Sequence, residues 1–116
     1  MSDAPMTVVE TAEFLRHAAR LISDWECEEL IAFLGANTEA GEIIPETGGV
    51  RKIRWAREGM GKRGGARVIY YYHSKRLPVF LLTVYAKARK ANLTKAERDA
   101  MKRLVPLLLA GYPRKA

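Results

Sequence analysis

Four basic side chains, Lys52, Arg54, Arg67 and Lys87, lie in stretches that are rich in β-branched and aromatic residues. Lysine and arginine bind phosphate oxygens, and the planar guanidinium group of arginine donates two parallel hydrogen bonds to them. Several such cations on one surface attract a polyanion over a long range. Whether these four act together depends on the elements that carry them.

Residues 50–55, 67–73 and 79–87 are predicted to form three antiparallel strands, because turn residues bound each run. Successive side chains of a strand point to opposite faces of the sheet. We expect the first face to carry Ile53, Trp55, Val68, Tyr70, Tyr72, Leu82 and Val84. We expect the second face to carry Lys52, Arg54, Arg67, Tyr85 and Lys87. The first face therefore suits a hydrophobic core, and the second suits an anion.

Charge is distributed unevenly along the chain, whose net charge is +7 at pH 7. Residues 1–48 contain two basic and ten acidic side chains, a net charge of −8, whereas residues 49–116 contain eighteen basic and three acidic ones, a net charge of +15. Such a basic segment favours a nucleic-acid partner. The alternative is that the basic side chains form ordinary solvent-exposed faces of strands and a helix.

The length of 116 residues predicts a single domain, residues 1–116, that can bury a core without disulfide bonds or a metal ion. The one cysteine suits a reducing compartment. The sequence has no run of about 18 apolar residues and no signal-peptide pattern. We therefore expect a cytoplasmic protein with no membrane partner and no cofactor or metal.

A short strand at residues 7–10 and a helical hairpin are expected before the three strands. The first helix starts at Thr11 and has an apolar side at the helical period. This side comprises Phe14, Leu15, Ala18, Leu21 and Ile22.

The second helix starts at a capping box formed by Ser23 and Glu26 and is expected to end at Gly35. Cys27 lies on its apolar stripe, together with Leu30, Ile31 and Leu34. We therefore predict that this cysteine packs in the core and is not a nucleophile.

A third helix is expected after the strands, from a second capping box formed by Thr94 and Glu97. Its apolar face comprises Met101, Leu104, Val105 and Leu108. Pro106 is expected to kink or interrupt the helix, because proline lacks an amide donor and clashes with the preceding turn. The connector at residues 37–49 could start a further strand at residues 42–44.

The turn at residues 59–65 contains the pattern G-x-G-x-x-G. It joins two strands, whereas the dinucleotide-binding fingerprint must open a helix after a strand. It also fails as a P-loop, because Arg63 replaces the hydroxyl residue that would hold magnesium. Two interpretations stay open: a basic loop that closes over phosphates, and a plain hairpin turn.

Three segments carry a family resemblance: residues 48–55, 65–72 and 82–87, followed by Asn92-Leu93-Thr94. Together they resemble the RelE/ParE superfamily of bacterial type II toxins, particularly its RelE-like, HigB-related members, from about Val8 to Val105. The resemblance implies an α+β fold of the microbial ribonuclease type. We expect a twisted antiparallel β-sheet with an N-terminal helical hairpin and a C-terminal helix.

The resemblance also implies a function. RelE-like toxins cut messenger RNA, usually in the ribosomal A site, as metal-independent endoribonucleases, and a cognate antitoxin holds them inactive. In HigB-like systems this antitoxin is commonly a helix-turn-helix protein encoded next to the toxin. Two alternatives remain at this point: a ParE-like poison of DNA gyrase, and a nucleic-acid-binding module without catalytic activity.

Carried over residue by residue, the resemblance assigns catalytic roles to Lys52, Arg54, Arg67 and Lys87. RNA supplies its own nucleophile, so the protein must assist attack of the 2′-hydroxyl on phosphorus and stabilise the charge that develops. Arg67 would stabilise that charge. Lys52 or Arg54 would perturb or remove the hydroxyl proton, and Lys87 would protonate the leaving oxygen. Tyr85 is expected to stack on a base. The RNA-binding residues that we predict are Arg51, Arg57, Lys62, Arg63, Tyr71, Tyr85, Arg89 and Lys90.

Overall fold

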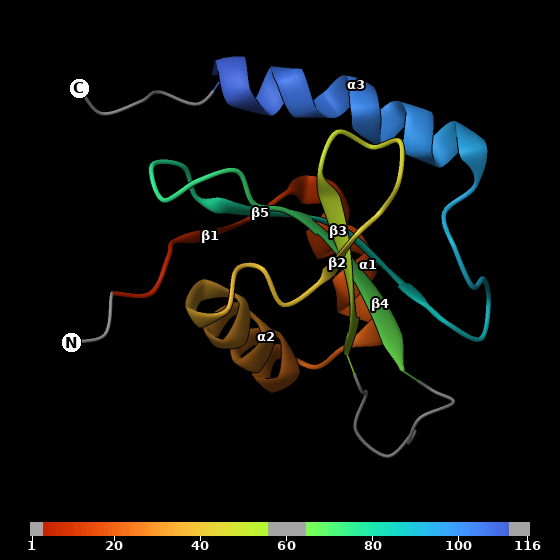
Figure 1. Cartoon of the computed structure of the whole chain (residues 1–116). Helices are drawn as coiled ribbons and strands as arrows, with labels where there is room; N and C mark the ends of the chain where they lie inside the picture. Colours follow the sequence, from red (N-terminus) through yellow and green to blue (C-terminus); the bar gives the residue numbers. More distant parts are fainter. Residues whose placement is uncertain (1–3, 56–64, 112–116) are drawn as a thin grey trace.

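The computed structural model describes residues 4–55 and 65–111. In chain order its elements are β1 (Val8–Glu10), α1 (Ala12–Leu21), α2 (Asp24–Ala36), β2 (Glu42–Ile43), β3 (Val50–Trp55), β4 (Ala66–Tyr71), β5 (Val79–Ala86) and α3 (Lys95–Gly111). The five strands form one sheet in the order β1-β5-β4-β3-β2. The hairpin of α1 and α2 covers one face of this sheet and α3 lies over the other (Figure 1).

The α+β class, the helical hairpin and the closing helix are confirmed. The meander of β3, β4 and β5 is antiparallel, as predicted, and β2 extends it on the far side of β3. The sheet as a whole is mixed, because β1 pairs with β5 in the parallel direction. The long connection through both helices and the meander makes this parallel pairing possible, since parallel neighbours need a crossover.

The first core lies between the sheet and the helical hairpin. Phe14, Leu30 and Leu34 are fully buried there against Val68 and Tyr70. The Tyr70 hydroxyl donates to the Thr38 carbonyl at 2.9 Å and accepts from the Gly41 amide at 2.8 Å, so the phenol keeps its hydrogen bonds inside the core. Leu15, which we expected on this side of α1, is instead half exposed.

The second face of the sheet is only partly open, because α3 covers one half of it. Val50, Ile69 and Tyr71 pack there in a second core, together with Val105 of α3. This face, which we expected to suit an anion, is therefore only partly available to one. Only the half that extends beyond α3 can meet a ligand.

A bulge in β5 explains a second difference from the predicted faces. Ile69 pairs with Thr83, but its neighbour Tyr70 pairs with Leu81, so β5 carries one extra residue at this point. An extra residue reverses the alternation of side chains. Leu82 therefore lies in the second core rather than the first, while Val84 stays in the first as predicted.

Both predicted capping boxes are confirmed at the starts of α2 and α3. The α2 helix continues to Ala36, so Gly35 does not end it. Gly35 instead allows a close approach of the N-terminal segment, because a Cβ atom there would lie 2.8 Å from the Met6 carbonyl oxygen.

The predicted interruption at Pro106 is wrong, since α3 runs from Lys95 to Gly111 through this residue. Pro106 is on the exposed side of the helix, as is Lys102, whose carbonyl lies one turn earlier. Water can therefore bind the carbonyl that proline leaves without an amide donor. Burial of Val105 beside it holds the helix on the sheet.

Candidate phosphate-binding site

Three polar side chains form a row across the second face, from the exposed Arg54 to Tyr85 at the border of the second core. Arg54 of β3 pairs with Arg67 of β4, and Arg67 pairs with Tyr85 of β5. Lys52 lies two residues before Arg54 on the same face of β3. Lys52, Arg54, Arg67 and Tyr85 therefore share one face of the sheet, as predicted.

A cavity of about 320 Å³ joins three of the cations. Lys52, Arg54 and Arg67 line it, and Glu42 contributes a carboxylate. We call it the phosphate cavity. Its three positive charges and one negative charge give an excess of two positive charges, which suits a phosphate group.

Arg67 is the most unusual residue of the row. Only 7% of it is exposed, and its Nη1 atom is buried with no hydrogen-bond partner among the described residues. No carboxylate of the described chain forms a salt bridge with it. Buried charges are normally paired, because removing a charge from water is costly. An unpaired arginine at this place is suited to receive an anion from outside.

Tyr85, next in the row, is also buried, and its hydroxyl oxygen has no partner among the described residues. Burial raises the pKa of this phenol, while the nearby charge of Arg67 lowers it to a smaller extent. The net direction is upward, so the hydroxyl stays protonated at neutral pH and can donate a hydrogen bond. Two adjacent donors without partners thus lie side by side on β4 and β5.

The ring of Tyr85 is in contact with a cation. Lys90 places its ammonium nitrogen 4.8 Å from the ring centroid, in a cation–π contact. The same ammonium group pairs with the carboxylate of Glu97 on α3. Because Lys90 covers the ring, the expected stacking of Tyr85 on a base is not supported by its surroundings.

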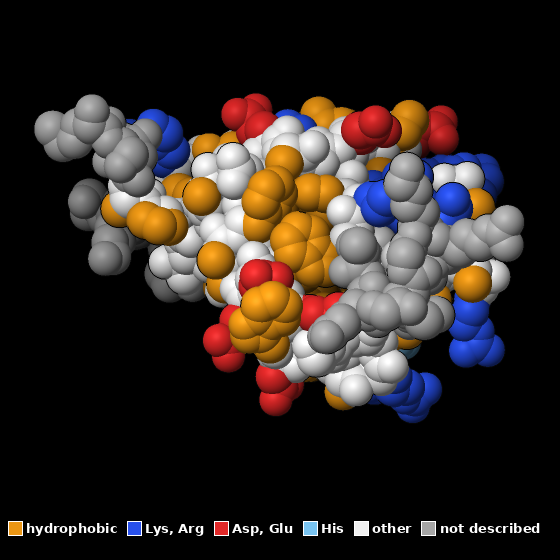
Figure 2. All heavy atoms as spheres, turned by 90° about the horizontal axis from the view of Figure 1, so that it is seen from below, with side chains coloured by type: hydrophobic (Ala, Val, Ile, Leu, Met, Phe, Trp, Pro, Cys, Tyr) orange, Lys and Arg blue, Asp and Glu red, His pale blue; other side chains and the backbone are white. Residues whose placement is uncertain are grey.

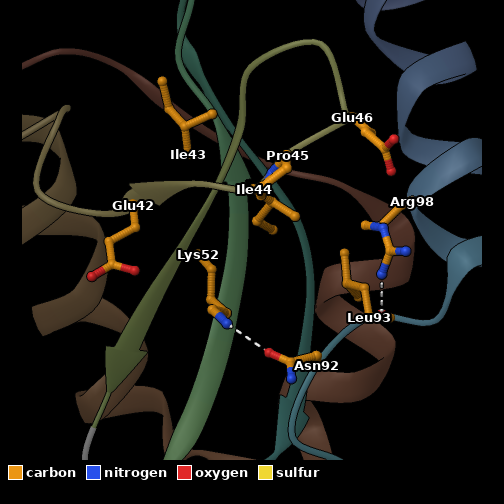
Figure 3. A pocket seen from close by; sticks show the side chains of 9 residues that line it. All are labelled: Glu42, Ile43, Ile44, Pro45, Glu46, Lys52, Asn92, Leu93 and Arg98. Carbon is orange, nitrogen blue, oxygen red and sulfur yellow. Dashed lines mark hydrogen bonds between the residues drawn. The ribbon is translucent and has the colours of Figure 1, made fainter.

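Lys52 takes its hydrogen-bond partner from another element. Its ammonium group donates to the Asn92 side-chain oxygen at 3.0 Å (Figure 3). Glu42 pairs with Lys52 in the ladder between β2 and β3, but its carboxylate points away from the ammonium group in Figure 3. No carboxylate of the described residues forms a salt bridge with Lys52, so its ammonium group can also contact an anion in the phosphate cavity.

Lys87 stands apart from the other three predicted catalytic residues. It follows the last residue of β5, and its side chain is exposed. Its amide donates to the Gly65 carbonyl at 3.1 Å, which continues the β4–β5 ladder by one step. It is not among the described residues that line the phosphate cavity. Lys87 therefore lies at the rim of the site, beyond Tyr85.

The structure contradicts the prediction for two of the RNA-binding residues. Arg51 pairs with Tyr70 and so lies on the face opposite to Lys52. Its guanidinium group donates to the Gly41 carbonyl at 2.7 Å and lies 3.6 Å from the Glu39 carboxylate. Tyr71 is 4% exposed in the core beneath α3. Neither side chain is available to RNA.

The remaining predicted RNA-binding residues lie at the edge of the site or outside the described part. Arg89 is exposed in the turn after β5, and Lys90 is occupied by Tyr85 and Glu97. Arg57, Lys62 and Arg63 fall outside the described residues, as does most of the glycine-rich turn.

Charge is separated in space as it is in the sequence. In the view from below, most visible Lys and Arg side chains gather toward the right, whereas Asp and Glu side chains lie mainly toward the left and along the upper edge (Figure 2). Basic side chains thus gather on one side of this view, which favours approach of a polyanion from that side.

Residues that could support other chemistry do not gather at this site. Among the described residues, no group of three His, Cys, Asp or Glu side chains could hold a metal ion. Burial, with a hydrogen bond to Glu10, raises the pKa of the Cys27 thiol to about 12, so it is not a nucleophile at neutral pH. No helix in the described ranges is long and apolar enough to cross a bilayer.

Two residues beside the site carry no predicted role. Asn92 holds Lys52, and Arg98 of α3 lies near it with its Nη1 atom donating to the Leu93 carbonyl at 2.9 Å. Asn92 belongs to a segment that carries the family resemblance, but sequence alone does not show that it meets β3. Only the docking of α3 brings both residues to the sheet.

A comparison with known families agrees with this architecture. The family described as the RelE toxin of the RelE/RelB toxin–antitoxin system matches residues 6–112 of the chain. This range includes every described strand and helix of the sheet, hairpin and closing helix. The chain therefore belongs to the RelE toxin family.

Proposed function

We propose that this toxin is a metal-independent endoribonuclease that cuts messenger RNA on the ribosome and so stops translation. The single observation that supports it most is the buried Arg67, whose Nη1 donor has no partner among the described residues and which lies between Arg54 and Tyr85 in one row. A phosphate group is the ligand that would satisfy both Arg67 and the Tyr85 hydroxyl.

In the proposed reaction the 2′-oxygen of the RNA forms a bond to the adjacent phosphorus and the bond from phosphorus to the 5′-oxygen breaks. Negative charge increases on the phosphoryl oxygens during this step. Arg67 and the Tyr85 hydroxyl, fixed by the sheet, would bind those oxygens more strongly in the transition state than in the ground state. The products are a 2′,3′-cyclic phosphate and a 5′-hydroxyl end.

Proton transfers fall to the neighbouring cations in this proposal. Lys52 or Arg54 would help to remove the proton of the 2′-hydroxyl, because both line the phosphate cavity. Lys87, at the rim beyond Tyr85, would protonate the leaving 5′-oxygen of a substrate that extends past the cavity. No histidine is among the described residues that line the cavity, so we propose that the ribosome supplies much of the positioning.

RelE toxins act with an antitoxin, and we propose that the partner here is a helix-turn-helix protein encoded next to the toxin. The basic site and the acidic surface of α2 offer it two different docking regions. Action on translating ribosomes takes place in the cytoplasm.

Expression of the toxin without its antitoxin tests the proposal. Incorporation of labelled amino acids should fall before incorporation of labelled thymidine, and messenger RNA should show new internal ends. An early DNA-damage response with intact messenger RNA would identify a gyrase poison instead. Growth without arrest, with folded toxin present, would identify a binding module.

A further inference from the structure

A second cavity lies directly beside the phosphate cavity. It has a volume of about 300 Å³ and shares Glu42 and Lys52 with its neighbour. Its other walls come from the connector after β2, from the segment before α3, which carries Asn92, and from Arg98 of α3 (Figure 3). We call it the Asn92 cavity. Its volume is at the lower end of the range for small-molecule sites, about 300–1,000 Å³.

The two cavities differ in charge. Two cations, Lys52 and Arg98, line the Asn92 cavity and face two carboxylates, Glu42 and Glu46, so the formal charges balance. The phosphate cavity has an excess of two positive charges. Electrostatic attraction therefore binds a phosphate group more strongly in the phosphate cavity. The Asn92 cavity better suits a neutral group that carries hydrogen-bonding atoms.

The walls of the Asn92 cavity combine apolar surface with one amide. Ile44, Pro45 and Leu93 contribute apolar side chains. Leu93 is 5% exposed and immediately precedes the capping box of α3, so the segment that carries Asn92 is anchored in the second core. Flat apolar groups with polar edges, such as nucleobases, bind between walls of this kind.

The Asn92 amide can read such an edge while it holds Lys52. Its oxygen accepts from the Lys52 ammonium group at 3.0 Å and has a second lone pair. Its nitrogen has two donors that no other described residue uses. An asparagine amide that offers an acceptor beside a donor complements adenine, which presents an amino group beside a ring nitrogen.

We propose that the Asn92 cavity binds the nucleobase next to the cleaved phosphate and that Asn92 makes adenine the preferred base there. This inference rests on the proposed ribonuclease function. Lys52 connects the two sites, since it lines both cavities, and its ammonium group would contact the sugar–phosphate link between base and phosphate. Single-stranded RNA is commonly recognised in this way, by the edges of unstacked bases.

Mapping of cleavage sites tests the proposal. The wild-type toxin should cut with an excess of adenine, on the order of tenfold, at one fixed position beside the cut. Asn92→Ala should remove that excess, and Asn92→Asp should move it toward cytosine, because a carboxylate accepts from the cytosine amino group. Asn37→Ala is the matched control. Asn37 is the C-cap of α2, and among the described residues its side chain donates only to the Phe33 carbonyl, so this variant should cut with the wild-type preference.

A binding measurement on the wild-type protein gives a second, independent readout. The sequence contains two asparagines and no glutamine, so its ¹H–¹⁵N spectrum has two side-chain amide pairs. An uncleavable 2′-O-methyl oligonucleotide of adenines should shift the Asn92 pair and leave the Asn37 pair in place. The uridine oligonucleotide should shift the Asn92 pair much less.

Three outcomes would overturn the inference. One is a wild-type base preference that persists in both Asn92 variants. Another is wild-type cleavage with no preference beside the cut, and the third is an Asn92 amide pair that responds equally to both oligonucleotides or to neither. In each case RNA cleavage by the wild-type toxin would leave the proposed function standing. Absence of cleavage by wild-type toxin on ribosomes would defeat both.

Discussion

Replacement of Arg67 by methionine separates the two roles that a buried arginine can have, in folding and in phosphate binding. Methionine keeps an unbranched side chain of similar reach, so the packing against neighbouring strands is largely retained. The change removes the guanidinium group, whose Nη1 atom is buried and has no partner among the described residues.

The expected effects on stability and activity have different signs. An unsatisfied buried donor costs about 1–3 kcal/mol, so the free energy of unfolding of Arg67→Met should be unchanged or higher by about 1 kcal/mol. Loss of a donor aimed at developing phosphoryl charge should slow RNA cleavage by about a hundredfold or more. The toxin would become more stable and inactive at once.

Urea denaturation followed by tryptophan fluorescence gives the stability, and cleavage of messenger RNA on purified ribosomes gives the activity. Arg76→Met is the matched control, because Arg76 is exposed in the loop between β4 and β5 and should change neither quantity. The reasoning is refuted if Arg67→Met cuts RNA at the wild-type rate. It is also refuted if the variant loses several kcal/mol, because Arg67 would then have a structural partner.

Three further predictions follow from the surroundings of single side chains. Tyr85→Phe removes the buried hydroxyl that has no described partner, so it should unfold at the same or a higher urea concentration and cut RNA about tenfold more slowly. Burial alone would raise the pKa of Glu97, but its hydrogen bonds to Lys90 and Thr94 outweigh burial and lower this pKa. The stability that these interactions contribute is therefore present above the unfolded-state pKa of 4.5 and is lost as pH falls below it. Glu97→Gln should flatten that acid dependence of stability in thermal melts. The Cys27 thiol has a pKa of about 12, so at pH 8 it should react with a disulfide reagent far more slowly in native than in urea-unfolded protein. Equal rates in the two states would contradict its burial beside Glu10.

Local signals predicted the elements of this fold well. The capping boxes at Ser23 and Thr94 each depend on residues three positions apart, so they are visible in the sequence alone. The meander strands follow from short runs of β-branched and aromatic residues between turns. These features do not depend on where the rest of the chain lies.

The errors share a tertiary origin. The side chain of Leu82 changes face because of a bulge that only the register between β4 and β5 reveals. Tyr71 is buried because α3 docks over its half of the sheet, and this docking has no local signal. The error at Arg51 has a different origin, because alternation of side chains along β3 already predicts that Arg51 and Lys52 lie on opposite faces. On its own face, Arg51 donates to the Gly41 carbonyl.

The candidate site shows the same division. Lys52, Arg54, Arg67 and Tyr85 share one face by alternation, which the sequence predicts and the register confirms. That Arg67 has no described partner could not be predicted, because pairing depends on which carboxylates the fold brings near. The Asn92 cavity was missed because its walls come from β2, β3, the segment before α3 and α3 itself, which are distant in the sequence.

The chemistry of the RNA ends tests the central claim most directly. Purified toxin is added to ribosomes that carry a defined messenger RNA, and both ends at each new break are identified. Attack by the 2′-hydroxyl at the Arg67 row predicts 2′,3′-cyclic phosphate and 5′-hydroxyl ends that disappear with Arg67→Met and persist with Arg76→Met. Ends of 5′-phosphate and 3′-hydroxyl, or breaks that persist without Arg67, would contradict the account.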